Sequence, residues 1–111
     1  MKRQPPRLSP QQIAGIASLF ASLAEPSRLC LLHALMDGPA TVGELVCRTG
    51  LQQANASRHL AGLRGTGLLE RRREGKFVRY SIRDPLVYRL CDLVCGKLKR
   101  DAKETVDHFV R

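Results

Sequence analysis

The sequence lacks any apolar run that approaches the roughly 20 residues a helix needs to cross a bilayer. Its first basic residues, Lys2 and Arg3, are followed by Pro5 and Pro6 instead of the apolar core of a signal peptide. These absences predict a cytoplasmic protein without a membrane partner. In that reducing compartment we expect the four cysteines to be thiols that pack or bind ligands, not structural disulfides.

Catalytic motifs are also absent. There is no glycine-rich phosphate loop, no metalloprotease helix and no convincing pairing of a nucleophile with a base. We therefore predict that the protein is not an enzyme and requires no cofactor. The sequence has no internal repeat and no low-complexity linker. This predicts one domain over residues 9–111, preceded by a flexible arm at residues 1–8.

Acidic residues are scarce, since 10 Asp and Glu stand against 19 Lys and Arg and give a net charge of +9. Residues 58–83 contain eight basic and two acidic residues, so this quarter of the chain holds two thirds of the excess. A positive surplus concentrated in one segment is typical of nucleic-acid binding.

Capping patterns and apolar spacing predict a series of helices before this basic segment. Ser9 and Gln12 form a capping box at the start of the first helix, and Thr41 and Glu44 form another at the start of the third. The second helix is apolar on nearly all sides, which predicts that it is central and buried. The predicted helices span residues 9–23, 26–36, 41–50 and about 52–64.

The third and fourth helices are short and joined by a turn that contains Gly50, which is typical of a helix-turn-helix. Residues 68–82 then alternate around Glu74 and Gly75 as a hairpin. A long helix follows from Asp84, with these apolar residues predicted to face inward: Val87, Leu90, Cys91, Val94 and Leu98. The predicted fold is mainly α with a small β-hairpin, a winged helix-turn-helix. Because both terminal helices are more apolar than one small core requires, we expect them to pack across a two-fold axis in a homodimer.

The fourth helix combines amides, hydroxyls and a guanidinium in its first half, which are the groups that read base edges in the major groove. Gln52 lies where backbone N–H groups favour phosphate. The predicted DNA contacts in this helix are Gln52, Gln53, Asn55, Ser57, Arg58 and His59. For His59 a capping or packing role is favoured over a catalytic one. The alternative is that these are solvated polar residues of a surface helix.

Basic residues around the hairpin turn suit phosphate contact and entry into the minor groove beside the fourth helix. The predicted contacts in the wing are Arg71, Arg72, Arg73, Lys76 and Arg79. The alternative is a charged edge strand that protects against aggregation.

Four segments together resemble the ArsR/SmtB family of metal- and redox-responsive repressors. They are AEPSRL at residues 24–29, TVGEL at 41–45, SRHL at 57–60 and RREGKFVRY at 72–80. The resemblance covers about residues 13–98. It implies a homodimer joined through its first and last helices, which binds an imperfect palindrome in double-stranded DNA and leaves it when an inducer binds.

Two familiar inducer sites of that family are not matched. The arsenic-type cysteine cluster would fall on Thr41, Gly43 and Val46, none of which is a ligand, while Cys47 stands one position off. The zinc-type set on the last helix is also missing, because Val94 stands where a histidine two residues after Asp92 would be required.

Cys91 and Cys95 remain, and their spacing places both sulfurs on one helix face within reach of one soft ion. A third ligand from Cys30, Cys47, a histidine or the other subunit would suit arsenite, cadmium or zinc. Alternatively the pair is a thiol sensor that is oxidised or persulfidated, or the cysteines are small packing residues.

Other classes of function compete with a signal-responsive repressor. A non-sensing architectural or RNA-binding winged helix would explain the charge but not the polar face of the fourth helix. A module that binds only other proteins is the third class. Sequence-specific, salt-dependent binding to a palindrome separates the repressor from both.

Overall fold

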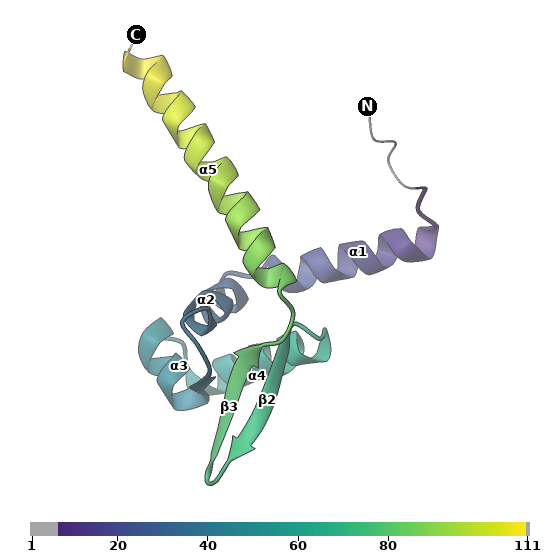
Figure 1. The fold of residues 1–111 in the computed structure, drawn as a ribbon, viewed down its shortest axis with the longest axis vertical. Helices are drawn as coiled ribbons and strands as arrows, with labels where there is room; N and C mark the ends of the chain where they lie inside the picture. Colours follow the sequence, from purple (N-terminus) through teal and green to yellow (C-terminus); the bar gives the residue numbers. More distant parts are fainter. Residues whose placement is uncertain (1–6, 111) are drawn as a thin grey trace.

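The computed structural model describes the backbone of residues 7–110 and the side chains of residues 7–105. Most of the arm predicted at residues 1–8 therefore lies outside the described residues. The elements, in chain order, are α1 (Pro10–Leu23), α2 (Pro26–Leu35), β1 (Ala40–Thr41), α3 (Val42–Thr49), α4 (Gln53–Gly65), β2 (Leu69–Glu74), β3 (Phe77–Ile82) and α5 (Leu86–Val110). This order confirms the predicted winged helix-turn-helix (Figure 1).

The core lies between α2, α3, α4 and the base of the sheet. α2 contributes three buried leucines, Leu31, Leu32 and Leu35, although Leu29 on its other side is exposed. α4 presents Ala56, Leu60 and Leu63 to the same core, as its spacing predicts. Burial of this leucine-rich set is the main stabilising contribution to the body that carries the wing.

Both predicted capping boxes are present. The Ser9 hydroxyl accepts from the backbone N–H of Gln12, whose side chain accepts from the backbone N–H of Ser9. Thr41 and Glu44 exchange the same pair of bonds at the start of α3. α3 ends at Gly50, whose φ of 76° is the left-handed conformation that favours glycine.

The sheet contains a third strand that the sequence does not predict. β1 pairs antiparallel with β3 through Ala40 and Tyr80, so the strand order is β1-β3-β2. At two residues, β1 is too short to show a period-2 pattern. The hairpin turn also differs by one residue from the prediction, because Glu74 pairs with Phe77 and the turn is Gly75 and Lys76. Gly75 has a φ of 60°, as a two-residue hairpin turn requires.

α1 and α5 extend from the body as two arms that point in different directions (Figure 1). Of the α5 residues predicted to face inward, Val87 is buried, while Leu90 and Cys91 are half-buried. Val94 and Leu98 are 54% and 61% exposed because α5 leaves the body after its second turn. No residue of α1 is buried.

Within residues 7–110, no single helix is long and apolar enough to cross a membrane. The bent pair of α1 and α2, at 78° to one another, passes that test by length and composition alone.

Candidate nucleic-acid interface

α4 is amphipathic, with one face in the core and a polar face toward solvent. Gln52, Gln53, Ser57 and Arg58 are exposed on that polar face. Asn55 is half-buried, and its Oδ1 accepts a hydrogen bond of 2.6 Å from Nη2 of Arg58. The predicted contacts other than His59 therefore form one polar surface over the first two turns of the helix.

Gln52 is the N-cap of α4, but its side chain does not cap the helix. The first N–H groups of an α-helix have no partner within the helix and carry the positive end of its dipole. The start of α4 is thus chemically suited to an anion such as a phosphate.

His59 lies apart from the other predicted contacts of α4, because its side chain faces the protein and is only 10% exposed. Its Nδ1 accepts a hydrogen bond of 3.2 Å from Nε of Arg28, and its Nε2 lies 3.5 Å from Oε2 of Glu25. The structure therefore places His59 in the packing role that the sequence analysis favoured over catalysis.

The five predicted contacts of the wing divide between two faces of the hairpin. Arg71 and Arg73 lie on the same face of the hairpin as Leu69 and Tyr80. The base of this face packs toward α4. Both arginines are exposed, and in the described part of the chain neither forms an ion pair. The same is true of Lys76 at the turn.

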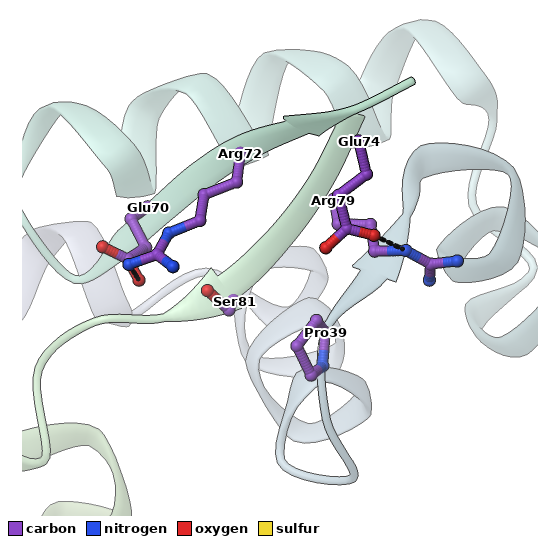
Figure 2. A pocket seen from close by; sticks show the side chains of 6 residues that line it. All are labelled: Pro39, Glu70, Arg72, Glu74, Arg79 and Ser81. Atoms are coloured by element: carbon purple, nitrogen blue, oxygen red, sulfur yellow. Dashed lines mark hydrogen bonds and ion pairs between the residues drawn. The ribbon is translucent and has the colours of Figure 1, made fainter. Parts of the chain in front are cut away.

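Arg72 and Arg79 lie on the opposite face, among carboxylates. Arg79 donates from Nε to Glu74 at 2.9 Å, and Arg72 lies 3.7 Å from Glu70 (Figure 2). A pocket of about 260 Å³ on this face is lined by Pro39, Glu70, Arg72, Glu74, Arg79 and Ser81. The charges of Arg72 and Arg79 are therefore partly balanced within the wing.

Arg79 also joins the wing to the first helix of the helix-turn-helix. Its Nη1 donates to Oε1 of Glu44 at 3.2 Å, and Thr41, the N-cap of α3, is its neighbour across the β1-β3 ladder. Hydrogen bonds from the backbone and side chain of Thr41, followed by the charges of Arg79 and Arg48, hold the pKa of Glu44 below its ordinary value. The sequence predicts Arg79 as a DNA contact, but no local pattern indicates Glu44 as its partner.

The four cysteines do not form a complete metal site in one chain. Cys91 is half-buried against the core, whereas Cys95, Cys30 and Cys47 are exposed. Over the described residues, no group of three or more His, Cys, Asp or Glu side chains is placed to hold a metal ion.

Burial, followed by the neighbouring Cys95 and Asp92, raises the pKa of the Cys91 thiol. A raised pKa lowers the thiolate fraction, and the thiolate is the reactive form. The raised pKa thus disfavours the thiolate of Cys91, and Cys95 is the more exposed member of the pair.

Sequence reasoning missed Arg28, whose side chain contacts α4. Arg28 falls in the AEPSRL segment, but its partner His59 is 31 residues away, and no local spacing relates the two. The N-cap role of Glu25, which accepts from the backbone N–H of Arg28 at 3.0 Å, is a local signal that could have been found.

Comparisons with known proteins agree with this arrangement. Residues 25–71 match the model of the bacterial regulatory protein, arsR family. The chain is 42% identical over 78 residues to a probable mercury resistance operon repressor of Streptomyces lividans, covering 70% of this chain. That match spans only 60% of the relative's length. The present chain is also 39% identical over 85 residues to the HTH-type transcriptional regulator NmtR of Mycobacterium tuberculosis, and this match covers 77% of the chain and 71% of the relative.

Solved structures match over nearly the whole chain. The crystal structure of M. tuberculosis Rv0081 has a TM-score of 0.79 at 32% identity, covering 89% of this chain and 99% of that one. The AntR antimony-specific transcriptional repressor has a TM-score of 0.79 at 27% identity, covering 91% and 92%.

Proposed function

Because the chain belongs to the ArsR/SmtB family of bacterial transcription regulators, we propose that it is a homodimeric repressor of a palindromic operator. A metal, metalloid or thiol-directed signal releases it from the DNA. This role involves no catalytic step and no permanently bound cofactor, and it places the protein with the DNA in the cytoplasm.

The observation that carries the proposal is the polar surface of α4 beside the positive face of the wing. Gln53 and Asn55 are the amides suited to adenine edges, and Arg58 is suited to guanine or phosphate. Arg71 and Arg73, which form no ion pair within residues 7–105, supply positive charge on the face of the wing toward α4, where backbone phosphates would lie. An architectural protein without sequence preference would need the charge but not the amides.

Dimerisation is supported by the apolar surface that the arms leave exposed. Ile13 and Phe20 on α1 are 55% and 57% exposed, and Leu93, Val94 and Leu98 are exposed on α5. Large exposed apolar surface on a small domain usually marks an interface. A two-fold dimer would present two copies of α4 to successive turns of one groove.

The signal is proposed to act at Cys91 and Cys95. Two relatives are named for soft elements, the mercury resistance operon repressor and the antimony-specific AntR. Since two thiolates leave arsenite, cadmium or zinc incompletely coordinated, the third ligand would come from the partner subunit or from movement of Cys30 or Cys47. Ligand capture on α5 would then shift the arms and change the separation of the two α4 helices.

The test begins with selection of bound sequences from a random double-stranded DNA pool, followed by titration at several salt concentrations. A palindrome bound with a steep salt dependence supports the repressor. Binding indifferent to sequence would favour the architectural alternative, and a protein that binds no DNA would contradict both.

The signal is tested by repeating the titration with arsenite, cadmium, zinc, peroxide and a persulfide donor. The variant is Cys91→Ser/Cys95→Ser, and the matched control is Cys30→Ser/Cys47→Ser. Release that is lost in the first variant and retained in the second supports an α5 site completed by the partner subunit, whereas release lost in both variants supports a third ligand from Cys30 or Cys47. If the first variant still releases DNA with every inducer, the α5 site is wrong.

A further inference from the structure

Arg28 connects three helices through one guanidinium. Its Nη1 donates to the backbone carbonyl of Ser22 at 3.2 Å, in the last turn of α1. Its Nε donates to Nδ1 of His59 at 3.2 Å, in the middle of α4. Arg28 itself lies in the first turn of α2. The last carbonyls of a helix have no partner within it, so the two bonds together connect the end of α1 to α4, the recognition helix of the proposed function.

The guanidinium also lies directly against the backbone of α4. A Cβ built on Gly62 would be 3.0 Å from Cζ of Arg28 and still closer to Nη2. Only glycine leaves room for this approach without moving the arginine. His59 and Gly62 are one turn apart on α4. The Arg28 guanidinium therefore donates to His59 at its Nε and lies against Gly62 at its Nη2.

The orientation of His59 is fixed by the same cluster. Because Nδ1 accepts from Arg28, a neutral His59 carries its hydrogen on Nε2, which faces the Glu25 carboxylate. Glu25 in turn caps α2 by accepting from the backbone N–H of Arg28. Among the described residues, the hydrogen-bond partners of the guanidinium therefore come from α1 and α4, the two helices that the arginine joins to α2.

We infer that Arg28 is a positioning residue that sets the angle between the α1 arm and α4. Few other contacts constrain this arm, because no residue of α1 is buried. Its apolar contacts with the core come from Leu19 and Leu23, which are half-buried near its end. The inference rests on the proposed function, in which α1 belongs to the dimer interface. The angle between α1 and α4 in each subunit then determines the distance between the two recognition helices.

The experiment measures how strongly operator spacing affects binding. Once the palindrome has been selected, its two half-sites are separated by one or two base pairs more or fewer, and an isolated half-site is titrated in parallel. We expect the wild type to prefer its own spacing by about tenfold or more, and Arg28→Gln to reduce that preference to about threefold or less. Affinity for the half-site is expected to change far less, because one α4 suffices there.

Gly62→Ala disrupts the contact between Arg28 and α4 by a change in α4, since the added methyl displaces the guanidinium. We expect the same loss of spacing preference, and no further loss when Gly62→Ala is added to Arg28→Gln. Arg64→Gln is the matched control. It removes the same charge from an exposed position on α4 that forms no ion pair within residues 7–105, and it should keep the wild-type spacing profile.

The result that overturns the inference is a folded Arg28→Gln protein with the wild-type spacing preference. A purely structural role is shown instead if half-site and full-site affinities fall by the same factor. Failure of the proposed function has a different signature, because the wild type itself would then show no preferred palindrome. Circular dichroism of each variant establishes that the titrations concern folded protein.

Discussion

Arg79 in the wing donates to Glu44 in α3 at 3.2 Å, and at the same time to Glu74 across the hairpin at 2.9 Å. This one side chain links the wing to α3. Its charge is shared between two carboxylates, whereas Arg71 and Arg73 lie on the other face and, within residues 7–105, form no ion pair. The basic wing thus contains arginines with different environments.

This difference predicts different salt dependences of DNA binding. Arg73→Ala should reduce the magnitude of the negative slope of log K against log salt, where K is the association constant for DNA, by about 1, because one phosphate contact is lost. Arg79→Ala should change the slope less, since its charge is already balanced by Glu44 and Glu74. Titrations at four or more salt concentrations measure both slopes. A slope change for Arg79→Ala that equals or exceeds that for Arg73→Ala would contradict the assignment.

Glu44 predicts a pH dependence of stability. The pKa of Glu44 is lowered in the folded protein, first by hydrogen bonds from Thr41 and then by Arg79 and Arg48. The folded state therefore binds fewer protons than the unfolded state, and stability from Glu44 rises with pH. The contribution is fully present above the ordinary pKa of about 4.5 and is lost as the pH falls through the lowered value.

The measurement is urea unfolding of the wild type and Glu44→Gln between pH 7 and the acid limit of folding. The difference in free energy of unfolding should be constant near neutral pH and should shrink below the ordinary pKa. A difference that stays constant throughout would show that the carboxylate charge contributes nothing.

Cys91 and Cys95 should differ in reactivity although they lie one turn apart. Burial raises the pKa of Cys91 and limits access to its sulfur, while Cys95 is exposed. In the Cys30→Ser/Cys47→Ser background, iodoacetamide should therefore modify Cys95 first at neutral pH. Peptide mass spectrometry over time measures the two rates. Faster modification of Cys91 would mean that its thiol is more activated than the structure indicates.

Local patterns were sufficient to predict most of the fold. Capping residues identified the starts of α1 and α3, and the spacing of Ala56, Leu60 and Leu63 identified the buried face of α4. The polar face followed from the same spacing, because residues outside an apolar stripe must face away from the core.

Contacts between distant segments could not be predicted in the same way. Arg28 and His59 are 31 residues apart and Glu44 and Arg79 are 35 apart, and in each case the partner is defined only by packing. The strand β1 depends on pairing with β3, not on its own two residues. The exposure of Val94 and Leu98, which were predicted to face inward, has a related reason. An amphipathic pattern shows that a face is to be covered, but not whether its own chain or another covers it.

The exposed face of α5 gives the most direct test of the dimer. Val94→Asp and Leu98→Glu should each weaken association without unfolding the body, because both side chains are exposed in the single chain. Burial of such a side chain contributes roughly 1.5–3 kcal/mol, and two-fold symmetry repeats each substitution in both subunits. The dimer dissociation constant should therefore rise by about 100-fold or more.

Sedimentation equilibrium over a range of concentrations measures this change, with Lys99→Glu, an exposed polar position on the same helix, as the control. As dimerisation weakens, affinity for the palindrome should fall, while affinity for an isolated half-site should stay unchanged. A variant that stays fully dimeric would place the interface away from this face of α5.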